Sequence, residues 1–371
     1  GSTGREHMSI QQPDVLQALS AVIDPNTGKD FVSTRQLKNL QVDANGDVAF
    51  DVELGYPAKS QIPALRQALV AAARGVPGVG NVSANLATHI TAHAVQRGVP
   101  LLPQVKNIVA VASGKGGVGK STTAANLALA LAAEGARVGL LDADIYGPSM
   151  PIMMGVSGRP ESLDGQNMEP LENYGVQVMS IGFLVDPDEA MIWRGPMATQ
   201  ALDQLLRQTS WKELDYLIVD MPPGTGDIQL SLSQRVPMTG AVIVTTPQDI
   251  ALADAKKGVA MFEKVGVPIL GLVENMAVHV CSNCGHVEHI FGAEGGKRYA
   301  AQKGIDYLGA LPLSLAIREQ ADSGRPSVIA DPDGEAARSY KAIARQVAIR
   351  IAAKAKDFSA RFPAINISRD T

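Results

Sequence analysis

The amino-acid sequence predicts an α/β protein in which a mostly parallel, doubly wound sheet is preceded by a small α+β domain. From residue 107 onward, apolar strand candidates alternate with helices, which is typical of a parallel sheet covered on both faces. A glycine-rich loop at residues 114–121 joins the first of these strands to a helix. Residues 9–93 instead show the order α-β-β-α-β, which indicates a separate and smaller fold.

The composition bounds the domains and the functions they can serve. A chain of 371 residues is long enough for two or three domains, and 46% hydrophobic residues can form a large core. The net charge of −4 and the isoelectric point near 5.9 weigh against a general nucleic-acid binder. The sequence has no apolar run of the roughly 18 residues that a membrane span needs. Residues 1–8 resemble a cloning remnant and not a signal peptide. We therefore expect a cytoplasmic protein that binds neither nucleic acid nor membrane.

The small domain, residues 9–93, is built around a predicted hairpin. Asn45-Gly46, the preferred dipeptide of tight hairpin turns, separates two strand candidates in which apolar and polar residues alternate. The expected elements are a helix at 14–23, strands at 37–42, 48–54 and 79–90, and an amphipathic helix at 62–74.

The large domain, residues 107–356, follows a proline-containing linker at 94–106 and precedes a polar, loose tail at 357–371. Its strand candidates are 108–112, 137–141, 176–181, 214–219, 240–245, 268–273 and 306–310, and its helices are expected near 119–134, 196–208, 251–265, 294–303 and 334–355. Ligands of such sheets bind at the carboxyl ends of the strands, so functional residues are expected there.

The glycine-rich loop reads Gly114-Lys115-Gly116-Gly117-Val118-Gly119-Lys120-Ser121 and is followed by Thr122. Backbone N–H groups of such a loop and of the next helix converge on one point, where they hold a phosphate. Lys120 would reach the β- and γ-phosphates, and the Ser121 hydroxyl would bind Mg²⁺. The segment also satisfies the dinucleotide pattern G-x-G-x-x-G, but a dinucleotide site has no use for Lys-Ser at the helix start. The loop therefore favours a nucleoside triphosphate site.

Two other strand ends supply carboxylates. Strand 214–219 ends at Asp220, which fits a second Mg²⁺ position. Strand 137–141 ends at Asp142 and Asp144, a pair suited to water positioning or to Mg²⁺. Aspartate is also common as a cap or turn residue, which is the alternative for each one taken alone.

The two cysteines, Cys281 and Cys284, lie in a Cys-x-x-Cys-Gly turn. Two thiolates facing one centre are half of the ligand set that zinc or an iron–sulfur cluster takes, so a four-thiolate site needs two chains. The alternatives are zinc held together with His286 and His289, zinc held between subunits, and a redox disulfide. The pair does not open a helix that would lower a thiol pKa, which weighs against the disulfide.

The early lysine makes the glycine-rich loop resemble the deviant Walker A sequence of ParA/MinD-class P-loop ATPases. In that class this lysine crosses a dimer interface to the partner's phosphates. The resemblance implies that Lys115 acts in trans, that Asp144 positions or activates water, and that Asp220 supports Mg²⁺. It assigns Lys120 to catalysis as well as to binding.

The chain as a whole resembles the Mrp/ApbC-type iron–sulfur cluster carriers, which place a P-loop NTPase domain after a small MIP18-like domain. The matching segments are 114–121, 142–149, 220–227, Glu274-Asn275-Met276 and Cys281-x-x-Cys284. The resemblance implies a homodimer with a labile [4Fe–4S] cluster between Cys281 and Cys284 of both subunits. Slow ATP hydrolysis would gate transfer of the cluster to apo-proteins, and cluster scaffold proteins are further implied partners. It also implies adenine contacts from Asn275 and Pro312. No cysteine precedes Cys281, which puts any cluster role of the small domain in doubt.

Other ATPases of this class are the rival interpretations. A membrane-associated MinD-type protein needs a terminal amphipathic helix, but the apolar stripe at 340–354 is alanine-rich and ordinary for a packed helix. The acidic isoelectric point disfavours a DNA-partitioning ATPase. The nitrogenase iron protein spaces its two cluster cysteines far apart, unlike the pair here. The main alternative is a nucleotide-switched dimeric ATPase of MinD/ParA type with a structural zinc clasp.

Overall fold

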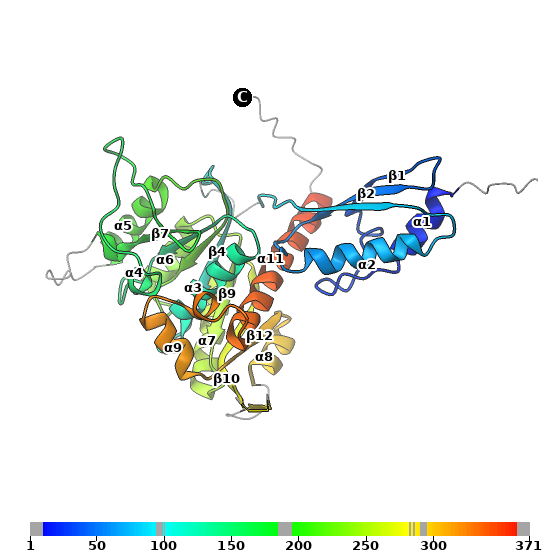
Figure 1. The fold of residues 1–371 in the computed structure, drawn as a ribbon. Helices are drawn as coiled ribbons and strands as arrows, with labels where there is room; N and C mark the ends of the chain where they lie inside the picture. Colours follow the sequence, from blue (N-terminus) through cyan, green and yellow to red (C-terminus); the bar gives the residue numbers. More distant parts are fainter. Residues whose placement is uncertain are drawn as a thin grey trace, which may run out of the picture. The chain divides into compact units, whose positions relative to one another are not determined.

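The computed structural model describes residues 10–93, 99, 101–184, 195–281, 283–284, 286–289 and 295–361 (Figure 1). Contacts divide the chain into two compact units, Gly1–Ile90 and Thr91–Thr371. The second unit includes β4, which begins at Val105, two residues before the expected start of the large domain.

The small unit has the expected α-β-β-α-β order. Its elements are α1 (Gln12–Leu19), β1 (Leu37–Val42), β2 (Val48–Leu54), α2 (Ile62–Arg74) and β3 (Val82–Thr88). β1 and β2 pair antiparallel across the turn that contains Gly46, whose φ of 83° is the left-handed conformation that glycine favours. β2 and β3 pair in parallel, with α2 packed against β3. Alternate residues of β2 are buried, as its sequence pattern predicted.

The large unit is built on one mostly parallel sheet in the order β11-β10-β9-β4-β8-β5-β7-β6, with β12 also paired to β10. The strands are β4 (Val105–Ala112), β5 (Val138–Asp142), β6 (Leu171–Asn173), β7 (Val176–Ser180), β8 (Leu214–Asp220), β9 (Gly240–Thr245), β10 (Ile269–Val280), β11 (Val287–His289) and β12 (Tyr307–Pro312). Among the described strands of this large sheet, only β6 and β11 run antiparallel to their partners. The predicted fold class is therefore confirmed.

Helices lie on the sheet, as the predicted alternation of strands and helices required. They are α3 (Lys120–Ala133), α4 (Met150–Met153), α5 (Gly195–Gln208), α6 (Asp227–Arg235), α7 (Asp249–Lys264), α8 (Gly295–Lys303), α9 (Leu315–Asp322), α10 (Ser327–Ala330) and α11 (Glu335–Arg361), with a 3₁₀ turn at Ile181–Phe183. The alanine-rich α3 is buried along most of its length and packs against α11 (Figure 1). The described helices include none long and apolar enough to cross a membrane.

Helix α11 corrects the expected tail. It continues through residues 357–361, which were expected to be loose. Residues 357–361 include no proline or glycine, and the first strong helix breaker is Pro363, so the helical pattern continues past residue 356. Residues 362–371 lie outside the described residues.

The sheet register sets the place of the site. Asp142 at the end of β5 pairs with Asp220 at the end of β8, and Val111 of β4 pairs with the same Asp220. Because all three strands are parallel, their carboxyl ends meet at one edge, directly below the glycine-rich loop that follows β4.

Candidate functional site

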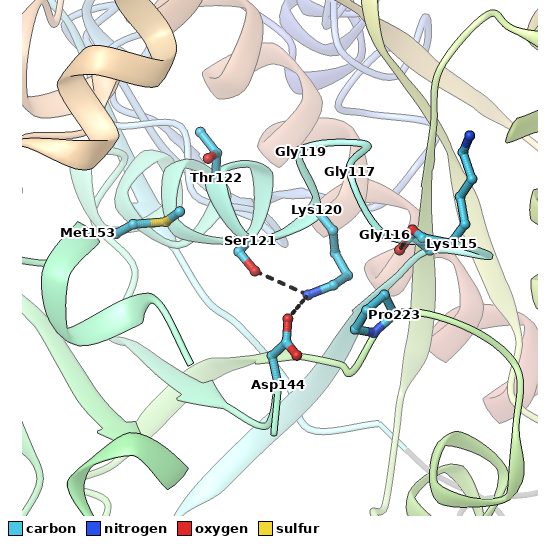
Figure 2. Close-up of a pocket in the computed structure, with 11 residues that line it drawn as sticks. Lys115, Gly116, Gly117, Gly119, Lys120, Ser121, Thr122, Asp144, Met153 and Pro223 are labelled. Atoms are coloured by element: carbon cyan, nitrogen blue, oxygen red, sulfur yellow. Dashed lines mark hydrogen bonds and ion pairs between the residues drawn. The ribbon is translucent and has the colours of Figure 1, made fainter. Parts of the chain in front are cut away.

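The glycine-rich loop and the neighbouring strand ends enclose a cavity of about 220 Å³ (Figure 2). Its lining comprises Ser113, Lys115, Gly116, Gly117, Gly119, Lys120, Ser121, Thr122, Asp144, Met153 and Pro223. The loop, the start of α3 and the end of β5 thus meet as predicted. Gly114 and Val118 belong to the loop but lie outside the lining.

Close packing explains two of the loop glycines. A Cβ on Gly114 would lie 2.0 Å from the carbonyl oxygen of Asp254 in α7. Gly119 has a φ of 77°, and a Cβ there would lie 2.2 Å from Nδ2 of Asn275. A larger residue at either position would displace the loop from the strand and helix that support it.

Lys120 lies at the centre of a buried ionic cluster. Its Nζ forms an ion pair with Asp220 Oδ1. The same Nζ lies 3.4 Å from Asp144 Oδ2 and 3.2 Å from Ser121 Oγ (Figure 2). Burial lowers the pKa of Lys120, but the attraction of the surrounding aspartates outweighs burial and leaves this pKa above its ordinary value. The lysine is therefore a fixed cation at the floor of the cavity.

Asp220 is completely buried beside this cation. The Ser121 hydroxyl donates to its Oδ2 over 2.6 Å. Burial raises the pKa of Asp220, while Lys120 and Ser121 oppose the rise. A serine hydroxyl beside a carboxylate is the oxygen donor set that Mg²⁺ prefers, so Ser121 and Asp220 fit the predicted magnesium position.

Asp142 has a different environment from the one expected for a catalytic carboxylate. It lies outside the cavity lining, and its oxygens accept hydrogen bonds from Asp144 N (3.1 Å), Met150 N (3.1 Å) and Ser180 Oγ (2.9 Å). Burial and the nearby Asp220 carboxylate raise the pKa of Asp142 to about 8, although these three donors oppose the rise. Asp142 thus fixes the Asp144 loop and the first turn of α4, while Asp144 alone of the two lines the cavity.

Lys115 is half-buried, and its side chain points away from Lys120 (Figure 2). The Ser113 hydroxyl donates to the Lys115 carbonyl over 2.7 Å and so fixes the backbone at the start of the loop. An amine directed away from its own phosphate site is the orientation that a lysine acting on another chain requires.

The two residues expected at adenine, Asn275 and Pro312, lie outside the cavity lining. Asn275 is buried in β10, and its Nδ2 donates to the carbonyl of Val118 over 2.9 Å. Pro312 ends β12, where it pairs with Val278. Asn275 therefore contacts the glycine-rich loop, whereas Pro312 is on β12, which pairs with β10. Neither residue lines the phosphate cavity.

The cysteine pair lies at the end of a β-hairpin. β10 and β11 pair antiparallel, and the backbone N–H of Cys281 donates to the carbonyl of His286 over 2.9 Å. Both cysteines are reduced thiols, with Cys281 half-buried and Cys284 exposed. In the described part of the chain, no three or more His, Cys, Asp or Glu side chains are grouped to hold a metal. Cys281, Cys284 and His286 are thus not grouped in this way in the described residues, and the His289 side chain lies outside them.

Three cavity residues were missing from the predicted set. Ser113 directly precedes the loop, and Pro223 belongs to the Pro-Pro-Gly segment after Asp220, within the 220–227 segment that carries the family resemblance. Met153 comes from the short helix α4, and no motif marked it. Its thioether lines the cavity near Ser121 and Thr122 (Figure 2).

Comparison with known proteins agrees with this geometry. The family described as "NUBPL iron-transfer P-loop NTPase" matches residues 104–348, and the family "Iron-sulfur cluster assembly protein" matches residues 12–84. An iron–sulfur cluster carrier protein of Escherichia coli (strain K12) is 50% identical over 94% of this chain and 95% of its own length. One from Pseudomonas fragi is 60% identical over 72% of this chain and 94% of its own.

A solved structure shows the same fold. A nucleotide-binding protein from Archaeoglobus fulgidus, in complex with ADP, has a TM-score of 0.55 and 36% identity over 62% of this chain and 90% of that chain. The family match covers well over half of the chain, and the relatives match nearly all of their own length. This chain therefore belongs to the NUBPL iron-transfer P-loop NTPase family, with an iron–sulfur cluster assembly domain before the NTPase domain.

Proposed function

We propose that this P-loop NTPase is an ATP-dependent iron–sulfur cluster carrier that works as a homodimer. It binds and hydrolyses ATP, holds a labile [4Fe–4S] cluster between its two subunits, and transfers the cluster to apo-proteins. One observation carries the proposal: a phosphate-type cavity and a Cys-x-x-Cys turn with an exposed Cys284 thiol occur together in a chain that has only two cysteines. The names of the relatives, iron–sulfur cluster carrier proteins, agree with it.

The nucleotide half of the function follows from the ionic cluster. Phosphate oxygens offer Lys120 an anionic partner. The backbone N–H groups of a glycine-rich loop and of the helix that follows it are general phosphate donors, and residues 114–122 would supply them. Ser121 and Asp220 would hold Mg²⁺, which neutralises charge on the phosphates. Asn275 of β10 and Pro312 of β12 would contact the adenine.

Hydrolysis requires a positioned water and a second cation. Asp144 lines the cavity on the side of β5, where its carboxylate can orient the attacking water. Lys115 points away from its own cavity and would complete the partner subunit's site. This arrangement makes hydrolysis depend on the dimer.

The cluster half of the function follows from the cysteine count. Four thiolates are needed for a [4Fe–4S] cluster, and each chain supplies Cys281 and Cys284. The exposed Cys284 thiol at a hairpin end suits a cluster that must reach other proteins. We further propose that residues 9–93 act as a separate domain, joined by the 94–106 linker, toward scaffold or acceptor proteins in the cytoplasm.

Anaerobic iron–sulfur reconstitution tests this proposal. The wild type should gain a visible chromophore and about four irons per dimer, and the Cys281→Ala/Cys284→Ala variant should gain neither. Asn283→Ala, in the same turn, is the matched control and should reconstitute like the wild type. One zinc per dimer without a chromophore would contradict cluster carriage and leave a nucleotide-switched dimeric ATPase with a zinc clasp.

A further inference from the structure

Strand β10 consists of two halves with different partners. Its first half pairs in parallel with β9 as far as Glu274. Its last residues, Val278–Val280, pair antiparallel with β11. Between the two halves the register with β12 moves from Glu274↔Ala310 to Val278↔Pro312, so β10 uses two more residues than its neighbour. We call residues 275–277 the β10 bulge.

The β10 bulge contacts the glycine-rich loop. Asn275 Nδ2 donates to the Val118 carbonyl over 2.9 Å, and the Met276 methyl carbon Cε lies 3.7 Å from the position of a Cβ on Gly119. Both contacts fall on the residues directly before Lys120. A movement of the loop at this point therefore displaces the side chains of the bulge.

The backbone of the bulge is strained at Met276. Its φ of 56° is in the left-handed region. Residues other than glycine, asparagine and aspartate rarely adopt this conformation. Such strain persists only where surrounding contacts impose it, and it concentrates at functional sites and switch regions. The half-buried Met276 side chain ends beside Gly119, so the strained residue is also the one that faces the loop.

The cysteines begin where the second half of β10 ends. Cys281 directly follows Val280, so Cys281 lies at most about 20 Å from Asn275 along the strand, at roughly 3.3 Å per residue. The backbone bond from Cys281 to His286 ties the first cysteine to the hairpin. A tilt of the hairpin at the bulge therefore moves the thiols.

We propose that the β10 bulge, and Met276 in particular, is the joint that couples nucleotide occupancy of the loop to the orientation of the cysteine hairpin. The proposal rests on the proposed function and names the regulation of its cluster site. Met276 is a positioning residue here, because it lies between the two sites and lines neither.

The two native cysteines allow a direct test, because they are the only thiols in the chain. In the reduced, metal-free full-length protein, the rate of thiol alkylation by iodoacetamide reports on the hairpin alone. We expect saturating ADP or a non-hydrolysable ATP analogue to change this rate by about fivefold or more, within the usual range of coupling between two sites. Met276→Gly should retain ADP binding, measured by calorimetry, and lose the nucleotide effect on alkylation. Glycine accepts the left-handed conformation without strain and has no side chain to contact the loop.

A matched control separates this effect from a general loss of strain. Glu213 is exposed, precedes β8 and also has a left-handed φ, of 47°. Glu213→Gly should keep the full nucleotide effect on alkylation. An equal loss in both variants would overturn the role of Met276.

A second measurement needs no variant and covers the case in which Met276→Gly fails to fold or to bind ADP. Hydrogen exchange of the wild type should show nucleotide-dependent protection in the loop, in the bulge and in the hairpin amides, including that of Cys281. Protection of the loop with an unchanged hairpin would overturn the coupling. Because neither readout contains a cluster, that result leaves the carrier function itself standing, while failed reconstitution would leave the coupling standing.

Discussion

Replacement of Lys120 by alanine should destabilise the NTPase unit strongly and in a pH-dependent way. The substitution removes the cation between Asp220, which is fully buried, and Asp144, which is 8% exposed. Truncating one partner of a buried ion pair costs about 3–5 kcal/mol, because the remaining charge is uncompensated. We expect a loss in this range at pH 7.5.

The pH dependence follows from the pKa of Asp220. Burial already holds this pKa above its ordinary value, and loss of Lys120 removes the main opposing attraction. A folded-state pKa above the unfolded value means that the folded state binds more protons, so stability is present at low pH and is lost as pH rises toward the folded pKa. The loss in free energy of unfolding caused by Lys120→Ala should therefore become smaller as the pH falls below 7.5, by up to about 1.4 kcal/mol per pH unit.

Urea unfolding of the wild type and of Lys120→Ala at pH 7.5 and pH 5.5 measures both effects. Lys115→Ala, in the same loop but half-buried, is the matched control and should change the free energy of unfolding by less than about 0.5 kcal/mol. Lys120→Met/Asp220→Asn should recover much of the loss, since the uncompensated charge is gone. A deficit below about 1 kcal/mol, or one that is equal at both pH values, would refute the view of Lys120 as the counter-ion of Asp220.

The remaining predictions concern the nucleotide cycle. Asp144→Ala should keep ATP binding and slow hydrolysis by roughly 100-fold, as loss of a group that positions water does; parallel loss of binding, seen in equilibrium titration, would argue for a structural role. Lys115→Ala and Lys120→Ala should each be inactive in ATPase assays. A mixture of the two variants should recover up to about a quarter of wild-type activity, because half of the dimers contain one chain of each kind and each mixed dimer has one complete site. An inactive mixture of exchanging dimers would argue against action in trans. Gly119→Ala should abolish nucleotide binding through its clash with Asn275 and the left-handed φ, and Gly119→Ala/Asn275→Ala should recover binding only in part; a single variant that binds ADP normally would show that the close approach is dispensable.

The sequence predicted the parallel core well because its chemistry is simple. Strands buried on both faces give continuous apolar runs such as Ile108–Ala112, and helices must return the chain between them. The antiparallel strands β6 and β11 were not predicted, since each has only three residues, too few to show an alternation of apolar and polar side chains. β10 was predicted to end at residue 273, because Glu274 and Asn275 interrupt its apolar run.

The same polar residues show why parts of the site escaped prediction. The Glu274 carboxylate accepts hydrogen bonds from the Gly296 backbone N–H and the Tyr307 hydroxyl, so it is satisfied inside the strand by partners that only the fold brings near. Asp142 looks equivalent to Asp144 in the sequence, and only the three donors around Asp142 separate their roles. Spacing along the chain predicted the loop and the cysteine turn, whose chemistry is local, but not these long-range partners.

The ion pairs of Lys120 also bear on how long a nucleotide stays bound. Asp220 and Asp144 already neutralise the ammonium, so an incoming phosphate must displace carboxylates that act as internal competitors. The binding free energy gained at Lys120 is then the difference between its contact with the phosphate and its contacts with the carboxylates. It is not the full strength of one charge-assisted contact. The loop can fold with its charge balanced before any ligand arrives, and the competing carboxylates speed release. A site built in this way favours rapid exchange of its nucleotide over tight retention.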